Sequence, residues 1–262
     1  MGNIAIIKGE VNGKKKSRKA KLGEAKELLK NPSIKTVVEK IGNVKGRLRT
    51  ISVKHVLGER NLVAVHKENS CLFKLDISSC YFSPRLSGER KEIAGRIKKN
   101  DSVLVMFAGV GVYPIVICKY SNPGRIVGVE IGKECCKYFQ ENLILNKMIN
   151  KIKIIQGDVK KKIRKGGLIV KGNLVPLQFD VVVMSRPNLK ESFLKQGLLA
   201  SKKGTKIFYY GFCNEDEKDK MAEDLIKESN ELKRKIKIIK VAKAGEIAPY
   251  KFRYRFEIKV LR

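Results

Sequence analysis

Histidine is nearly absent from this chain of 262 residues, which has only two, and its six cysteines show no metal-type spacing. Cys135 and Cys136 are adjacent, and the other four cysteines are scattered. Because zinc sites use closely spaced Cys and His ligands, we expect no zinc and no other bound metal. Without a disulfide pattern, a reducing cytosol is the default compartment, so we expect a cytoplasmic protein.

Long hydrophobic runs are also missing. The longest uncharged stretch, residues 102–118, is shorter than the roughly 20 residues that a membrane-spanning helix needs. It also contains Gly109, Gly111 and Pro114, which suit a strand followed by a tight loop. The first 21 residues lack the apolar core of a signal peptide. We therefore expect no membrane association through an inserted segment.

Acidic residues are scarce beside basic ones: 26 Asp and Glu stand against 57 Lys and Arg, a formal net charge of +31. Such an excess predicts a polyanionic partner, either a nucleic acid or an anionic membrane surface. The chain is not depleted of core-forming residues, because 43% of it is hydrophobic. That share excludes thorough disorder and suits one medium α/β domain with a small additional unit.

Residues 87–262 alternate between short apolar strands and helical segments. The strands are DSVLVMF, RIVGVEI, KIKIIQGDV, FDVVVMS and TKIFYYGF, and SGERKEIAGRIKK at residues 87–99 fits an amphipathic helix. This alternation indicates a parallel, doubly wound, Rossmann-like sheet. Two further strands, KIKIIKVAKA and FRYRFEIKVL, are joined by a link too short for a helical crossover, so they should pair antiparallel. We predict a seven-stranded, mostly parallel sheet.

Residues 1–86 have a different pattern and are predicted to form a small α+β domain. Two short helices are expected at residues 24–31 and 33–41, after a basic run at residues 14–21. The stretches ISVKHVL, NLVAVHKE and CLFKLDIS are rich in β-formers and separated by turn-like GER and ENS. We therefore divide the chain into a domain of residues 1–86 and a domain of residues 87–262.

A glycine-containing loop follows the first strand of the larger domain. Phe107 leads into it, and Gly109 and Gly111 allow the backbone to come close to a ligand. A lone G-x-G is weak evidence, and ordinary turn chemistry would explain it. Pro114 stands where a dinucleotide motif has its third glycine, which argues against NAD.

Two carboxylates follow the next two strands of the same domain. Glu130 ends IVGVE, where an acidic side chain can accept both hydroxyls of a ribose. Asp158 ends KIIQGD, which would place it near an adenine edge. Carboxyl ends of neighbouring parallel strands meet at one crevice. Taken jointly and in this order, the glycine loop and the two carboxylates favour a nucleoside-containing cofactor.

Several motifs resemble one family. FAGVG, ENLILNKMINKI, a hydrophobic-M-x-x-P motif, IFYYGF and the upstream SPRL-x-x-ER are similar to the archaeal and eukaryotic tRNA (guanine-N1)-methyltransferases and their wyosine-pathway relatives. These enzymes modify the purine at position 37, just 3′ of the anticodon. The resemblance implies a class I S-adenosylmethionine-dependent methyltransferase fold, S-adenosyl-L-methionine as cofactor, and the anticodon stem-loop of tRNA as partner. It covers nearly the whole chain, most densely at residues 56–210.

The resemblance also implies roles for residues near SPRL-x-x-ER. N1 of guanine carries a proton at neutral pH, so a base must remove it, and Glu89 matches the proposed base. Without the resemblance, Glu89 would be read as a helix-start residue that pairs with Arg90 or Lys91. Arg85 matches an arginine that organises the active site.

Two further residues of the N-terminal domain are assigned by approximate position. Arg49, or Arg47 if the register is shifted, would stabilise negative charge on O6 of the guanine, and phosphate contact is an equal alternative. Tyr81 matches an aromatic residue that packs against cofactor or base, and a purely structural tyrosine is the competing interpretation.

The chain departs from the family pattern in two places. Ser185-Arg186-Pro187 stands where the family has Asn-Leu-Pro, so Pro187 keeps the loop while recognition of the base by Ser185 is in doubt. Arg186 could add a cation toward a phosphate or O6. The chain also begins where the family's middle domain starts, so the domain that contacts the outer corner of tRNA is expected to be absent. The basic run at residues 14–21 could compensate, or it could be a solvated loop.

Three functions remain open from the sequence. The first is N1-methylation of guanosine 37, and the second is a wyosine-pathway activity, either methylation at C7 of 4-demethylwyosine or aminocarboxypropyl transfer. The third is a non-catalytic RNA-binding protein. A monomer is the default expectation, although the sequence does not determine the oligomeric state.

Overall fold

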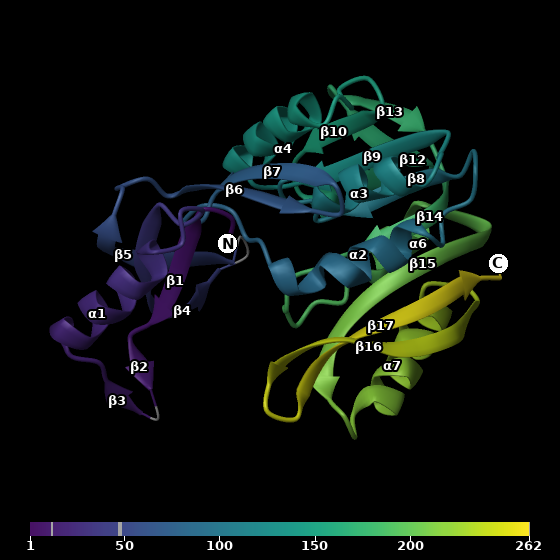
Figure 1. Ribbon diagram of the computed structural model, residues 1–262. Coiled ribbons are helices and arrows are strands. Elements are labelled where there is room, and N and C mark those ends of the chain that lie inside the picture. Colours follow the sequence, from purple (N-terminus) through teal and green to yellow (C-terminus); the bar gives the residue numbers. More distant parts are fainter. Residues whose placement is uncertain (12, 47–48, 262) are drawn as a thin grey trace.

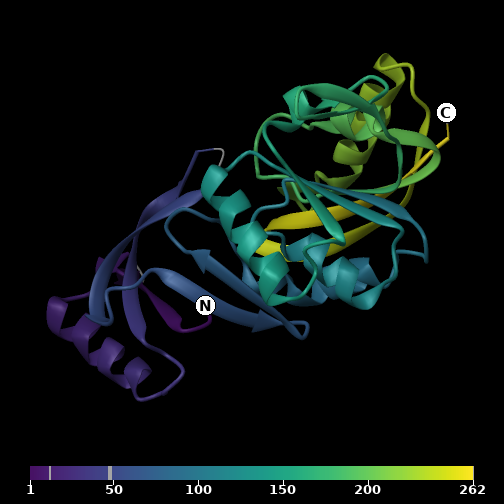
Figure 2. The ribbon, with the colours of Figure 1, turned by 90° about the horizontal axis from the view of Figure 1, so that it is seen from above.

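The computed structural model describes residues 1–11, 13–46 and 49–261, shown in two views in Figures 1 and 2. Its first part, called here the N-terminal unit, is a three-stranded sheet in the order β1-β4-β5 with one helix against it. Strand β1 runs parallel to β4, and β4 runs antiparallel to β5. The elements of this unit are β1 (Ile4–Lys8), β2 (Glu10–Val11), β3 (Lys14–Lys15), α1 (Arg18–Leu29), β4 (Thr36–Lys45) and β5 (Thr50–Gly58).

The structure corrects both helix predictions for this unit. The helix expected at residues 33–41 is wrong: Thr36, Val37 and Val38 start the central strand β4, where β-branched side chains fit the pleated surface. The helix expected at residues 24–31 starts earlier, because Ser17 caps α1 by accepting a hydrogen bond from the Ala20 N–H at 3.2 Å. The basic run at residues 14–21 therefore spans β3, the short link that ends at Ser17, and the first turn of α1.

A separate hairpin of β6 (Val63–Glu68) and β7 (Cys71–Asp76) follows the N-terminal unit, as expected from its turn signals. Two asparagines hold this hairpin against the larger part of the chain: Asn142 within α4 (Lys133–Leu145) and Asn146 directly after it. Asn142 and Asn146 bond both backbone groups of Lys74 and Leu72 respectively, over distances of 2.7 to 3.1 Å. The division at residue 86 stays a prediction.

The central sheet has seven strands in the order β10-β9-β8-β14-β15-β17-β16. Neighbours from β10 to β15 are parallel, and β17 is antiparallel to both β15 and β16. The predicted α/β sheet with its antiparallel end is confirmed. Its strands are β8 (Ser102–Met106), β9 (Arg125–Glu130), β10 (Ile152–Gln156), β14 (Phe179–Met184), β15 (Ser201–Asn214), β16 (Ile236–Ala248) and β17 (Lys251–Val260).

Helices cover both faces of this sheet, so alternate side chains of one strand enter two different cores. Val103 and Val105 of β8 belong to the core shared with α2, α3 and α4, and Leu104 and Met106 to the core shared with α6 and α7. Burial on both faces is why these strands are continuously apolar in sequence. The helices are η1 (Pro84–Leu86), α2 (Ser87–Ala94), α3 (Val112–Tyr120), α5 (Val159–Lys162), α6 (Leu194–Leu199) and α7 (Lys218–Glu231).

A small antiparallel sheet between β10 and β14 was not predicted from the sequence. It consists of β11 (Ile163–Arg164), β12 (Gly167–Val170) and β13 (Asn173–Pro176). Leu168 joins the core on the α6 and α7 side, so the insertion helps to cover that face. The carboxyl ends of β8, β9 and β14 are followed by loops that form the candidate site.

Candidate functional site

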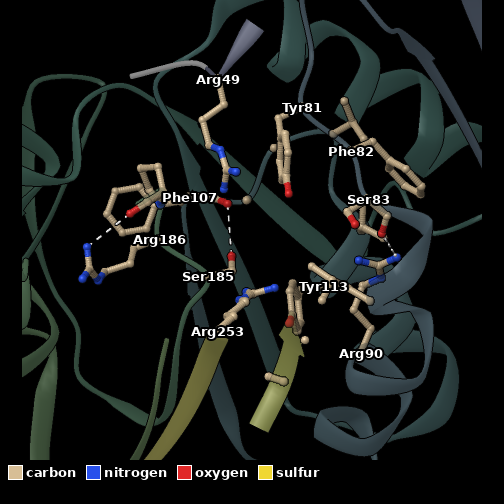
Figure 3. Close-up of a pocket in the computed structure, with 18 of the residues that line it drawn as sticks. Arg49, Tyr81, Phe82, Ser83, Arg90, Phe107, Tyr113, Ser185, Arg186 and Arg253 are labelled. Carbon is tan, nitrogen blue, oxygen red and sulfur yellow. Dashed lines mark hydrogen bonds between the residues drawn. The ribbon is translucent and has the colours of Figure 1, made fainter. Parts of the chain in front are cut away.

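A cavity of about 320 Å³ lies at the carboxyl ends of β8, β9 and β14 (Figure 3). Its walls come from the β4–β5 turn, the segment before α2, the loops after β8 and β14, and the β16–β17 hairpin. Most residues predicted for the site line it: Arg49, Tyr81, Arg85, Phe107, Gly109, Glu130, Ser185 and Pro187. The other three, Glu89, Gly111 and Asp158, lie outside its lining.

The loop after β8 requires glycine at its two positions for different reasons. Gly109 and Gly111 both have a positive φ, 57° and 87°. A Cβ at Gly111 would lie 2.1 Å from Cδ2 of Phe139, so this glycine is required by packing inside the protein. At Gly109 the nearest atom to an added Cβ is the carbonyl oxygen of Tyr81, 4.0 Å away. Gly109 is therefore the position that leaves space toward the cavity.

Glu130 is held at the end of β9 by two backbone donors. Its Oε2 accepts from the Gly109 N–H at 2.8 Å, and its Oε1 accepts from the Gly132 N–H at 2.7 Å. Burial raises the pKa of Glu130, although these N–H donors oppose the rise. A carboxylate oxygen can accept more than one hydrogen bond, so this fixed carboxylate can still bind ligand hydroxyls.

Asp158 lines a smaller recess next to the main cavity. Phe107, Ile131 and Pro187 belong to both, so the two spaces share an apolar wall. Asp158 caps helix α5 by accepting from the Lys160 N–H at 2.9 Å, which fixes its carboxylate beside that recess. The adjacent spaces suit a ligand with two parts, a sugar near Glu130 and a flat ring between apolar walls.

Arg49 of the N-terminal unit lies in the cavity wall. The guanidinium of Arg49 lies 4.1 Å from the ring centre of Tyr81, a cation–π contact that brings these two predicted residues together. Figure 3 shows Arg49 entering the cavity beside Tyr81. Arg47, the alternative assignment, lies outside the described residues. The arginine thus lies in the site, whichever acceptor it binds.

Glu89 is held away from the cavity by partners from distant strands. Its Oε1 accepts from Nη1 of Arg255 at 2.7 Å and from the hydroxyl of Tyr210. Neither Arg90 nor Lys91 is its partner; Arg90 instead forms a buried pair with Glu68. Burial and the neighbouring carboxylate raise the pKa of Tyr210, so its phenol stays protonated and donates to Glu89.

Arg255 is the centre of a buried charge cluster. Its guanidinium also contacts Glu92 and Glu257, the latter at 3.0 Å. Burial by itself would lower the pKa of Arg255, but the hydrogen bonds to Glu92 and Glu89 outweigh it and raise that pKa. The guanidinium is therefore permanently charged, and Glu89 is one of three carboxylates that balance it.

The loop after β14 is fixed by its own polar side chains. The hydroxyl of Ser185 donates to the carbonyl oxygens of Met106 and Phe107, each at 3.2 Å. Arg186, for which a phosphate or O6 contact was considered, donates instead to three carbonyl oxygens of its own loop, at 3.0 to 3.2 Å. These contacts position Pro187 on the cavity wall.

Some lining residues were not predicted from the sequence. They are Tyr113 at the start of α3, Phe212 of β15, and Ala244 to Ile247 and Arg253 from the β16–β17 hairpin. A signal for Arg253 existed: in FRYRFEIKVL, Arg253 and Arg255 interrupt an apolar strand at alternate positions and so share one face. Charged residues on the inner face of a strand need a partner or a ligand.

No described helix has the length and apolar character to span a bilayer. Among the same residues, no group of three or more His, Cys, Asp or Glu side chains is arranged to hold a metal ion.

Comparison with known proteins agrees with this architecture. The family model described as the TRM5/TYW2 methyltransferase domain matches residues 64–239. The tRNA (guanine(37)-N(1))-methyltransferase Trm5b of Pyrococcus abyssi is 32% identical over 213 residues, 81% of this chain and 58% of that protein. The tRNA (guanine(37)-N(1))/4-demethylwyosine(37)-methyltransferase Taw22 of Nanoarchaeum equitans is 30% identical over 269 residues, 87% of this chain and 89% of that protein. The solved complex of aTrm5 with tRNALeu superimposes with a TM-score of 0.81 at 26% identity, covering 99% of this chain and 70% of that chain.

The sheet order and the crevice at its carboxyl edge define a class I S-adenosylmethionine-dependent methyltransferase fold. The matched model covers well over half of the sequence, and the chain belongs to the TRM5/TYW2 methyltransferase domain family. The chain spans about half the length of the first curated relatives, 58% of Trm5b from Pyrococcus abyssi and 48% of that from Methanocaldococcus jannaschii.

Proposed function

We propose that this protein transfers a methyl group from S-adenosyl-L-methionine to N1 of the guanosine at position 37 of tRNA. The observation that carries the proposal is one cavity with two unlike halves. Glu130 and Gly109 of the central sheet face it from one side, and Arg49 and Tyr81 from another. The first half suits a nucleoside cofactor, and the second suits an electron-rich base or phosphate. The activities for which the relatives Trm5b and Taw22 are named support this assignment.

The residues at the edge of the sheet fit S-adenosyl-L-methionine. Glu130 would accept the ribose hydroxyls, and Gly109 leaves room for the chain of the cofactor beside it. Phe107 and Pro187 would pack against the adenine, with Asp158 at its edge. When bound, the cofactor supplies a methyl group already activated by its sulfonium. The protein is then left to align the base, remove the N1 proton and stabilise charge on O6.

Glu89 is our proposed general base, on the strength of the family resemblance and of its place in α2, which follows the cavity-lining Arg85. To receive the N1 proton, its carboxylate must turn from Arg255 and Tyr210 toward the cavity. Arg255 would tolerate the loss of Glu89 as a partner, because it keeps its ion pairs with Glu92 and Glu257. As N1 gains the methyl group, its proton would pass to Glu89, and Arg49 or Arg85 would stabilise the oxygen of the base.

The base assignment can be tested against a second carboxylate. Among the described residues, Glu130 and Glu246 are the carboxylates that line the cavity itself. Glu89→Gln should slow single-turnover methylation by about 100-fold or more while leaving tRNA affinity unchanged. Glu246→Gln is the matched control and should keep the wild-type rate. The reverse pattern would identify Glu246 as the base.

The activity itself is tested with labelled S-adenosyl-L-methionine and unmodified tRNA transcripts carrying G or A at position 37, followed by nucleoside analysis. Label should appear in 1-methylguanosine with the G transcript alone. Tight cofactor binding without transfer to any tRNA would contradict the proposal and favour a non-catalytic RNA-binding protein.

A second candidate function is methylation at C7 of 4-demethylwyosine. It is favoured by the two activities for which Taw22 is named and by Ser185, whose hydroxyl already donates hydrogen bonds to two backbone carbonyls. A serine so engaged has less to offer a guanine edge than an amide would. Transcripts carrying 4-demethylwyosine at position 37 test this activity, and a mass gain larger than one methyl would indicate aminocarboxypropyl transfer instead.

We also propose that residues 1–86 position the RNA, because Arg49 extends from that part of the chain into the cavity. The basic run at residues 14–21 would add phosphate attraction that depends on salt. The protein would act as a cytoplasmic monomer, which size measurements on the free protein and its tRNA complex can test.

A further inference from the structure

Two arginines of β17 share one face of the strand but differ in their partners. Both are buried, with Arg253 7% and Arg255 1% exposed. Arg255 is ion-paired with three carboxylates. The Nε of each arginine is a buried donor without an acceptor, but for Arg253, unlike Arg255, no hydrogen bond or ion pair of the guanidinium is found among the described residues. A buried guanidinium without an anion is costly unless a ligand supplies one.

The surroundings of Arg253 direct it into the cavity. Its guanidinium lies 4.0 Å from the ring centre of Tyr210, which holds it in place from one side. Figure 3 shows the side chain between Ser185 and Tyr113. The hydroxyl of Tyr113 is likewise buried and has no partner in the described part of the chain. Two unsatisfied donors thus line the same space.

We propose that Arg253 is an oxyanion-binding residue of the ligand site, with Tyr113 as a neighbouring donor. This inference rests on the proposed function, whose reactants carry two oxygen centres of the required kind. One is O6 of the target guanine, which becomes negative as N1 loses its proton, and the other is the carboxylate of the methionine part of the cofactor. Arg49 and Arg253 enter the cavity from opposite sides (Figure 3), so Arg253 can either join Arg49 at O6 from the other side or bind the carboxylate.

The sheet order favours the guanine as the ligand of Arg253. Glu130, where the ribose would bind, ends β9, whereas Arg253 lies on β17, with β8, β14 and β15 in between. Neighbouring strands are about 4.8 Å apart, so the two residues face different ends of the bound reactants. O6 is therefore the expected partner, and the carboxylate is the second source of the same chemistry.

The test compares ligands that differ by the oxygen in question. In the RNA arm, anticodon stem-loops with guanine or 2-aminopurine at position 37 are titrated into protein saturated with S-adenosylhomocysteine. In the cofactor arm, S-adenosylmethionine is compared with its decarboxylated form. Each titration is run on wild type, Arg253→Gln, Arg253→Lys and Lys259→Gln, an exposed lysine of the same strand that serves as the charge-matched control.

Wild type should prefer guanine to 2-aminopurine, and Arg253→Gln should lose about 10- to 100-fold of that preference, as expected for a hydrogen bond to a charged group. Lys259→Gln should keep it. Loss confined to the cofactor arm would also support the proposal and would assign the oxyanion to the carboxylate. Unchanged preference in both arms would overturn it.

Thermal unfolding separates this role from a structural one. Removing an unpaired buried charge should leave the melting temperature of Arg253→Gln equal to or above that of wild type. A lowered melting temperature with unchanged ligand preference would make Arg253 a structural residue and refute the proposal. If Arg253→Gln does not fold, Arg253→Lys keeps the charge but loses the planar fork, and its preference decides. These readouts need no methyl transfer, so a failure of the proposed activity would be recognised separately.

Discussion

Gly111 and Gly109 differ by two positions, yet the structure predicts different consequences for replacing each with alanine. At Gly111 the φ of 87° costs an alanine about 1–2 kcal/mol. The added Cβ would also lie 2.1 Å from Phe139, which has 0% exposure and cannot move aside. Overpacking of this kind adds about 1–3 kcal/mol, so Gly111→Ala should destabilise the protein by about 2–5 kcal/mol.

Gly109→Ala should cost only the backbone part, about 1–2 kcal/mol, because the nearest atom to its Cβ is 4.0 Å away. Its main effect should be on cofactor affinity, since the methyl group points toward the cavity. Urea unfolding followed by circular dichroism measures the first effect, and calorimetric titration with S-adenosylmethionine measures the second.

A double-mutant cycle isolates the collision with Phe139. In a Phe139→Ala background, Gly111→Ala should cost only about 1–2 kcal/mol, because the ring it would strike is gone. If Gly111→Ala is no more destabilising than Gly109→Ala, or if its cost is the same with and without the ring, the packing explanation is wrong.

Three further predictions concern charge and polar contacts. Because burial raises the pKa of Glu130, cofactor affinity should fall on acidification at a higher pH than it would with an exposed glutamate. Glu130→Gln should abolish that pH dependence. A wild-type affinity that does not change from pH 5 to 8 would argue against a role of Glu130 in binding the ribose. Asn142→Ala removes bonds to Lys74 and to the Val110 carbonyl and should lower the free energy of unfolding by about 2–4 kcal/mol; an unchanged urea midpoint would contradict this. The affinity for RNA should fall steeply as the salt concentration rises. Replacing the lysines of residues 14–21 by glutamine should make this salt dependence less steep and raise the KM for tRNA. An unchanged salt dependence would remove this segment from the RNA interface.

The central sheet was predictable because its signals are local. Strands buried on both faces are continuously apolar, and the short link between β16 and β17 allows only an antiparallel pair. The stretch that starts β4 shows the limit of such signals. The turn before Thr36 is compatible with either a helix or a strand. Pairing with β1 and β5 makes this segment a strand, and both partners lie elsewhere in the chain.

The site was predictable in the same uneven way. Glu130 and Gly109 could be placed because Glu130 is the last residue of β9 and Gly109 lies in the loop after β8, and both strands are evident in the sequence. The partner of Glu89 could not be predicted, since Arg255 is 166 residues away and meets it only after β17 has joined the sheet. Likewise Arg186 has the charge of a phosphate ligand, but the course of its own loop turns three carbonyls toward it. The contact between Glu89 and Arg255 joins distant segments, and the contacts of Arg186 depend on the path of its loop; the local sequence specifies neither.

The position of β17 has a consequence for how the site comes into being. Although β17 follows β16 in the chain, it lies between β15 and β16 in the sheet. During synthesis, β16 therefore has no neighbour to join until the residues after it have left the ribosome. Arg253, on that late strand, completes a cavity that also contains Arg49 from the N-terminal unit. A nascent chain would expose the open edge of β15 and bind its ligands poorly until β17 is made, so ligand binding would report that this sheet is complete.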